Sequence, residues 1–252
     1  MDQHPTTLYS PEFFSGQVDG SLASARAMLP VVLEVLRPLG VRSVVDFGCG
    51  TGVWLAEFQR LGVADFLGVD GDYVTAQSLR IEPARFRAAD LTRQISLERR
   101  FDLAMSLEVG EHLPTAASEV FVDNLCAAAD VVLFSACPPT PRHGTGHINE
   151  QTQSFWAEKF AARGFVASTA VRDRLWQQRE IEWFYRQNVV LYLKPDAARR
   201  CGLDGPCGPL DVRHPQFAAM LIAESVHMHS GPALLRILGR RLKDKLRRAF
   251  KA

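Results

Sequence analysis

The sequence predicts an α/β protein with a Rossmann-like, doubly wound and mostly parallel sheet. Short apolar runs of strand length alternate with helical patterns between residues 21 and 136, as in chains built from repeated strand–helix units. The fifth run is almost wholly apolar, which is typical of strands covered by helices on both faces. With 252 residues and 47% apolar content, the chain is long enough for one such domain.

The first predicted strand runs into a glycine-rich turn at residues 43 to 52, SVVDFGCGTG. Asp46 precedes Gly48, Gly50 and Gly52, which can take positive φ and let a ligand lie against the backbone. The helix that follows begins with free N–H donors. The spacing fits neither the dinucleotide G-x-G-x-x-G turn nor the P-loop. An acid at this place would repel a pyrophosphate and suits an α-amino group.

The D-x-G-x-G-x-G string resembles the first motif of class I S-adenosylmethionine (SAM) methyltransferases. This resemblance implies their fold, in which the final strand is antiparallel, and implies that Asp46 and the loop backbone hold the methionine part of SAM. A glycine turn that serves only the packing of helix on strand is the alternative. The loop residues expected at the cofactor are Gly48, Cys49, Gly50, Thr51 and Gly52.

The next predicted strand, residues 64 to 70, ends at Asp70. In a doubly wound sheet this acid would lie beside the glycine loop and accept ribose hydroxyls, for SAM or for NAD. A solvated turn aspartate is the alternative. The resemblance implies adenine contacts at the exit of a third strand near residues 85 to 91. The cofactor residues expected at these two exits are Asp70, Gly71, Ala89, Asp90 and Leu91.

The fourth predicted strand, residues 101 to 108, is followed by the sequence EVGEHLP. It resembles the E-x-x-E-H-[LV] stretch after strand four of many methyltransferases that act on small molecules, lipids and sugars. The resemblance implies that Glu108 faces the methionine end of SAM and that His112 lies near the methyl group or packs beneath it. A fifth strand is predicted over residues 130 to 136.

A long loop, residues 137 to 151, follows the fifth strand. Loops at the carboxyl edge of an α/β sheet usually carry substrate chemistry. Its segment GHINEQ resembles a bacterial SAM methyltransferase subgroup often associated with glycan and cell-envelope synthesis, and the resemblance runs from about Tyr9 to Leu193. Because a hydroxyl acceptor must lose a proton and histidine titrates near ~6.5, we expect His147 to be the general base, with His143 second and His112 third.

Two other interpretations of this loop are open. His143 and His147, with Glu108, Glu111 or Glu150, would hold a divalent ion that lowers the pKa of the acceptor hydroxyl, although a metal-free site is favoured. Alternatively, Asn149 caps a helix that begins at Glu150, and the histidine braces the loop.

Two further strands are predicted at residues 165 to 167 and 189 to 193, the place of the antiparallel edge in class I methyltransferases. The segment between them offers aromatic side chains for a sugar-binding wall or for the core, and arginines for an anion or for solvent. These residues are Trp176, Trp183, Tyr185, Arg172 and Arg174.

The net charge of +1 argues against a nucleic-acid partner. Residues 236 to 252 nevertheless hold eight basic residues and one acid, which leaves 21 basic and 27 acidic residues elsewhere. Apolar residues at helical spacing predict a basic amphipathic helix there. Residues 233 to 252 would contact an anionic membrane or an acidic protein, or form a solvated helix.

The predicted organisation is a cap and helix over residues 1 to 40, the methyltransferase domain over 41 to 194, a linker and short helix over 195 to 231, and the basic helix over 232 to 252. Five scattered cysteines without C-x-x-C spacing indicate a reducing compartment. The N-terminus lacks a signal-peptide pattern, and no apolar run reaches the ~18 residues of a membrane span. We expect a cytoplasmic location, with the tail as a contact to the inner face of the membrane.

These features together predict a SAM-dependent methyltransferase that acts on a sugar or polysaccharide hydroxyl in bacterial glycan or envelope synthesis. The alternatives are a lipid-linked or small-molecule acceptor and a noncatalytic SAM-binding partner of an assembly complex.

Overall fold

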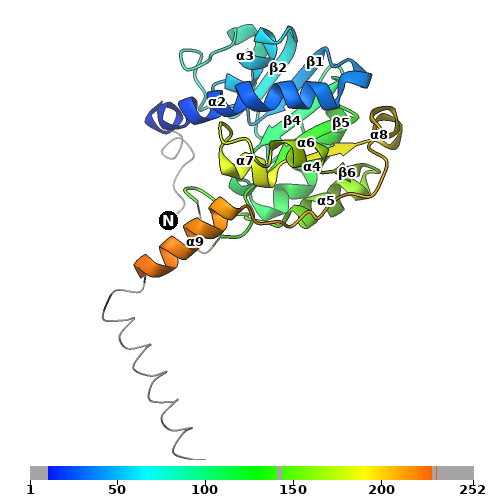
Figure 1. Ribbon diagram of the computed structural model, residues 1–252. Coiled ribbons are helices and arrows are strands. Elements are labelled where there is room, and N and C mark those ends of the chain that lie inside the picture. The colour runs from blue at the N-terminus through cyan, green and yellow to red at the C-terminus, as the bar shows by residue number, and fades with distance from the viewer. Residues whose placement is uncertain (1–10, 141–143, 229–230, 232–252) are drawn as a thin grey trace, which may run out of the picture. The chain divides into compact units, whose positions relative to one another are not determined.

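The computed structural model describes residues 11 to 140, 144 to 228 and 231, and these residues form one seven-stranded sheet in the order β3-β2-β1-β4-β5-β7-β6 (Figure 1). Strands β1 to β5 are parallel, whereas β7 is antiparallel to β5 and to β6. The predicted Rossmann-like α/β fold with an antiparallel final strand is therefore confirmed. The strands are β1 Ser43–Phe47, β2 Asp65–Asp70, β3 Phe86–Ala88, β4 Leu103–Leu107, β5 Val131–Ser135, β6 Val166–Ser168 and β7 Val190–Leu193.

Helices cover both faces of the sheet (Figure 1). Alternate strand residues face opposite ways, so Val44 packs on the layer of α2, α3, α6, α7 and α8, while Val45 packs on the layer of α4 and α5. The helices of the described residues are α2 Pro11–Val35, α3 Val53–Arg60, α4 Ser118–Ala128, α5 Gln153–Ala162, α6 Ala170–Leu175, α7 Trp183–Asn188, α8 Pro195–Cys201 and α9 Pro215–Met228.

The central strands are buried along their whole length, which explains their apolar sequences. Every residue of β1, β4 and β5 is buried. Their parallel register brings the carboxyl ends of the strands to the same edge of the sheet. Short 3-10 turns follow there, η3 Gly110–His112 and η4 Thr115–Ala117 after β4, while η1 Arg37–Leu39 and η2 Pro83–Arg85 precede β1 and β3.

Prolines occupy different places in α2 and α8. Pro30 lies inside α2, which continues to Val35, and is exposed to solvent while Leu29 and Val32 are buried. Residues 195 to 201, expected to be part of a linker, form α8. Pro195 occupies its first turn and Gly202 ends it with a φ of 67°, the usual asymmetry of helix ends.

The chain divides into two compact units, Met1–Val212 and Arg213–Ala252. In the second unit, α9 follows Arg213, whose guanidinium lies 5.3 Å from the centre of the Phe217 ring. The predicted basic helix over residues 232 to 252 lies outside the described residues and stays a prediction. Among the described helices, none combines the length and the apolar character needed to cross a membrane. All five cysteines carry free thiols, including Cys201 and Cys207.

The layer formed by α5 on β5 and β7 gives a test of the fold. Phe160 is fully buried, and its ring stacks on Tyr192 with 3.9 Å between centroids. Replacing Phe160 by Ala leaves a cavity and should lower the free energy of unfolding by about 3–5 kcal/mol, measured by urea denaturation. Val166→Ala, at an exposed site on β6, is the control and should cost about 0.5 kcal/mol or less. Equal losses in the two variants would contradict the packing of α5.

Candidate functional site

The glycine loop after β1 is held close to two other segments. Gly48 has a φ of 83°, and a Cβ atom there would lie 2.4 Å from Val109 Cγ2. Gly52 has a φ of 80°, and its Cβ would lie 2.9 Å from Ile81 Cγ1. Both positions therefore require glycine, for the backbone conformation and for the close approach.

Asp70 fastens this loop to the end of β2. Its Oδ2 accepts a hydrogen bond from Gly50 N at 2.7 Å, and its Oδ1 accepts one from Gly71 N at 2.7 Å and one from the Tyr73 hydroxyl. Burial raises the pKa of Asp70, although these three hydrogen bonds oppose the shift. The predicted position of Asp70 beside the glycine loop is thus correct, and its hold on the loop backbone is an additional structural role.

Asp46 is buried at the end of β1, near Asp70. Burial, and then the charge of Asp70, raise the pKa of Asp46 well above its ordinary value. Two neighbouring buried carboxyl groups favour a ligand that brings them positive charge or hydroxyl donors. Of the other loop residues, Cys49 is buried with Sγ donating to Gly50 O, and Thr51 O accepts from Arg80 N at 2.8 Å.

The exit of β3 lies beside Asp70. Ala89 N donates to Asp70 O at 2.8 Å, and Leu91 is buried. The Asp90 carboxylate is exposed and accepts hydrogen bonds from Thr92 N at 2.9 Å and from Thr92 Oγ1 at 2.6 Å. These bonds from Thr92 lower the pKa of Asp90. Asp90 therefore stabilises its own turn, and its contact with adenine stays a prediction.

Glu108, at the end of β4, holds a strained backbone conformation. Among the described residues it is the non-glycine with positive φ, at 57°, which costs on the order of 1–3 kcal/mol and is common at functional sites. Its N–H donates to Ser135 O at 2.9 Å, and its carboxyl accepts from Asn188 Nδ2 at 3.1 Å. Burial raises the pKa of Glu108. The contact with Asn188 could not be expected from sequence patterns, because 80 residues separate the two.

The loop after β5 is clamped to the turn after β4. Glu111 O accepts from Ile148 N at 2.8 Å and from Asn149 N at 3.0 Å, and Asn149 Nδ2 donates to Gly110 O at 3.1 Å. In one of the alternatives for this loop, Asn149 caps a helix beginning at Glu150. That alternative is wrong, because α5 begins at Gln153 and the Oγ1 of its N-cap Thr152 accepts from Phe155 N. The Asn149 side chain instead joins the two loops.

This clamp brings two of the three expected histidines together. The rings of His112 and His147 are perpendicular, with 4.7 Å between centroids. His112 Nδ1 lies 3.2 Å from Gly146 O, and because a carbonyl can only accept, Nδ1 is the protonated nitrogen. Burial, and then His147, lower the pKa of His112 to about 4, so it is neutral at neutral pH. His143 lies outside the described residues.

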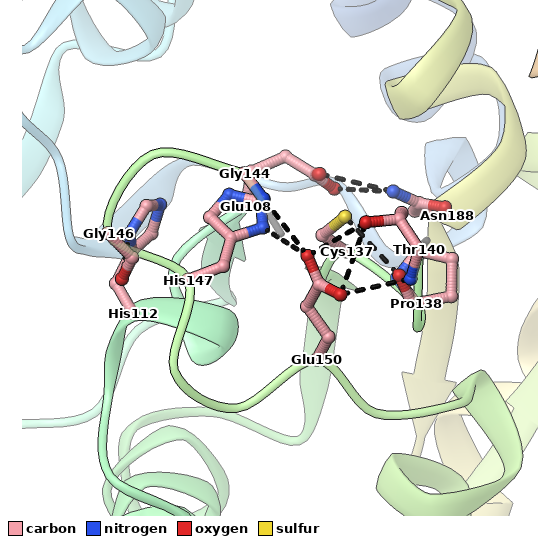
Figure 2. Close-up of polar contacts among 10 residues, drawn as sticks. All are labelled: Glu108, His112, Cys137, Pro138, Thr140, Gly144, Gly146, His147, Glu150 and Asn188. Atoms are coloured by element: carbon pink, nitrogen blue, oxygen red, sulfur yellow. Dashed lines mark hydrogen bonds and ion pairs between the residues drawn. The ribbon is translucent and has the colours of Figure 1, made fainter. Parts of the chain in front are cut away.

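Glu150 orients His147 (Figure 2). His147 Nδ1 lies 2.9 Å from Glu150 Oε1, while Thr140 N donates to Oε2 at 2.9 Å and Gly144 N to Oε1 at 3.2 Å. Burial opposes ionisation of Glu150, but the hydrogen bonds from Thr140, His147 and Gly144 outweigh it and lower the pKa. The ionised carboxylate fixes Nδ1 of His147 as the donor and leaves the lone pair on Nε2. This orienting role of Glu150 was not expected from the sequence.

The residues after β6 are mainly structural. Tyr185 is buried, and its ring meets Trp54 edge-on with 5.1 Å between centroids, which supports the core interpretation for this aromatic residue. Arg172 was expected in solvent or at an anion, and both expectations are wrong. It is buried and donates to the backbone carbonyls of Pro209 and Leu210, so it holds the segment after α8 against the domain.

The sequence belongs to a known family over most of this fold. Residues 21–170 match the family model described as a methyltransferase domain. The ubiquinone biosynthesis O-methyltransferase of Alkalilimnicola ehrlichii is 30% identical over 122 residues, which are 45% of this chain and 49% of that protein. The chain thus spans about half the length of this curated relative.

Two solved structures show the same fold at low identity. Streptomyces venezuelae DesVI has a TM-score of 0.54 and 15% identity, and the match covers 77% of this chain and 100% of that one. SAM-bound CalS10, an amino pentose methyltransferase from Micromonospora echinaspora, has a TM-score of 0.54 and 15% identity over 77% of this chain and 99% of that one. With its family match over residues 21–170 and its class I methyltransferase fold, the chain belongs to the methyltransferase-domain family.

Proposed function

We propose that this methyltransferase transfers the methyl group of SAM to a hydroxyl group of a sugar or polysaccharide in bacterial glycan or envelope synthesis. The main support for a hydroxyl acceptor is the pairing of His147 with the Glu150 carboxylate, in which Nδ1 and Oε1 are 2.9 Å apart. A hydroxyl must lose its proton during the transfer, and a histidine oriented by a carboxylate is suited to accept it.

The described residues fit SAM, which supplies a methyl group on a positively charged sulfur. Asp46 and Glu108 would face its α-amino group, and Asp70 would accept from the ribose hydroxyls. Ala89, Asp90 and Leu91 would line the adenine. The carboxyl groups of Asp46 and Glu108, whose pKa values desolvation raises, support this assignment, because a cationic ligand relieves the cost of their ionisation.

We assign His147 as the general base. Its Nε2 would take the proton of the acceptor hydroxyl, and the ionised Glu150 would stabilise the imidazolium that forms. His112 is neutral at neutral pH, and its half-buried ring lies against that of His147, so we rank it third as a base. His143 is the second candidate, as the sequence predicts.

A sugar acceptor is supported by the GHINEQ segment at residues 146 to 151, which resembles a subgroup associated with glycan synthesis. CalS10, named an amino pentose methyltransferase, shows that this fold serves sugar acceptors in another protein. A second candidate is a phenolic hydroxyl on a lipid-like molecule, because the curated relative is named a ubiquinone biosynthesis O-methyltransferase. A noncatalytic role in an assembly complex is the alternative from another class.

An acceptor panel separates these candidates. The full chain is incubated with methyl-labelled SAM and, in parallel, nucleotide sugars, polysaccharide extract and a polyprenyl catechol. The proposal predicts label in the sugar fractions as an alkali-stable methyl ether. Label in the catechol alone would reject the sugar acceptor and favour the second candidate. Absence of label from every fraction would favour the noncatalytic role.

The base assignment predicts the effect of His147→Ala. Removing the imidazole should reduce kcat by roughly 10²–10⁴-fold, while the dissociation constant for SAM, measured by calorimetry, stays within about twofold. Ile148→Ala, at an exposed neighbouring position, is the control and should retain both values. Turnover by His147→Ala at the wild-type rate would reject this base.

Glu150→Gln tests the orienting carboxylate and has a defined pH dependence. Because the folded-state pKa of Glu150 is lowered, its ionised form stabilises the fold above its unfolded pKa, and this contribution is lost as the pH falls through the folded pKa. Thermal unfolding should therefore show the largest difference between wild type and variant at neutral pH and a vanishing one in acid. kcat at neutral pH should fall by about 10²-fold or more. A pH-independent difference in stability would contradict the ionised pair.

A further inference from the structure

Three metal-ligating side chains meet next to the Glu150 pair. Glu111 and His112 come from the turn after β4, and His147 comes from the loop after β5. One ligand atom from each side chain lies within 4.8 Å of the other two. Two imidazoles and a carboxylate are the ligand set of many zinc and non-haem iron sites.

Glu111 is the first observation that points to a ligand. Its side chain is fully buried, neither carboxyl oxygen is in hydrogen-bonding geometry with a donor among the described residues, and it faces the carboxyl group of Glu108. Two neighbouring carboxyl groups away from water are costly to ionise, and a bound cation relieves that cost.

The two histidines provide a second, independent observation. His112 Nδ1 is paired with Gly146 O at 3.2 Å, and His147 Nδ1 with Glu150 Oε1 at 2.9 Å. Both partners are acceptors, so both rings carry the proton on Nδ1 and the lone pair on Nε2. Metal-binding histidines are held in this way, with one ring nitrogen donating to a carbonyl or carboxylate and the other on the metal.

We propose that Glu111, His112 and His147 bind a first-row divalent transition-metal ion, with Zn²⁺ as the representative. The carboxylate and the two Nε2 atoms would supply three ligands and leave a coordination position open. The ligand atoms lie within 4.8 Å of one another, so small side-chain rotations would place all three at the ~2.0–2.2 Å metal–ligand distances of such sites around one ion.

The metal site also has a consequence that rests on the proposed function. His147 has one lone pair, which binds either the metal or the proton of the acceptor. Zn²⁺ should therefore inhibit methyl transfer over the same concentration range in which it binds.

The binding test uses untagged full-length protein stripped with a chelator. Calorimetry with Zn²⁺ should show one high-affinity ion per chain, and Co²⁺ should give a visible spectrum of nitrogen and oxygen ligation. Absence of high-affinity binding would overturn the proposal. An intense thiolate-to-cobalt band would overturn it too, because it would assign the ion to the alternative set of Cys137, His147 and Glu150.

Matched variants locate the ion. Glu111→Gln keeps the shape of the side chain and removes its charge, and it should weaken Zn²⁺ binding by about 100-fold or more, as should His112→Ala. Glu119→Gln on the exposed face of α4 and Cys137→Ser should bind as wild type does. Unchanged affinity in Glu111→Gln with a wild-type circular dichroism spectrum would overturn the site.

Activity distinguishes failure of this proposal from failure of the proposed function. Inhibition by Zn²⁺ that disappears in Glu111→Gln supports both. Turnover that requires the ion would support the metal site and reject His147 as the base. Methyl transfer by a chain that binds no Zn²⁺ would overturn the metal site alone.

Discussion

The geometry of the site depends on the clamp between the loops that follow β4 and β5. Glu111 O accepts two backbone hydrogen bonds, from Ile148 and from Asn149, and the Asn149 side chain reaches Gly110 O. These bonds join segments that leave adjacent parallel strands at the same edge of the sheet. They hold the ring of His147 against His112, and the position of the proposed base follows from them.

The second constraint is electrostatic. Four acids lie at or just after strand ends on this edge: Asp46, Asp70 and Glu111 are buried and Glu108 is half-buried. Removal of the carboxyl group from water is the first cause of the raised pKa of each. Glu150, at the same edge, has a lowered pKa because backbone N–H groups of Thr140 and Gly144 and the ring of His147 donate to it. The site therefore contains two kinds of carboxyl group. Those with a raised pKa are stabilised by a cationic ligand, whereas Glu150 is ionised without a ligand and orients the proposed base.

The parts of this arrangement that sequence analysis could predict are local. The apolar strands, the glycine turn and the acids at the strand exits are each encoded within about ten residues, and Asp70 was expected beside the loop because parallel strands end at one edge. The clamp by Asn149, the pairing of Glu108 with Asn188 and the burial of Arg172 depend on contacts between distant segments. The residue types involved suit many roles. Sequence spacing therefore left a helix cap open for Asn149, and solvent or an anion for Arg172.

The central claim is that the glycine loop and the buried acids form a pocket for an adenosyl sulfonium and its product, rather than for a dinucleotide. Calorimetry of the full chain with S-adenosylhomocysteine and with NAD tests this claim most directly. The account predicts binding of one S-adenosylhomocysteine per chain and no heat with NAD. Binding of NAD without any binding of S-adenosylhomocysteine would contradict it.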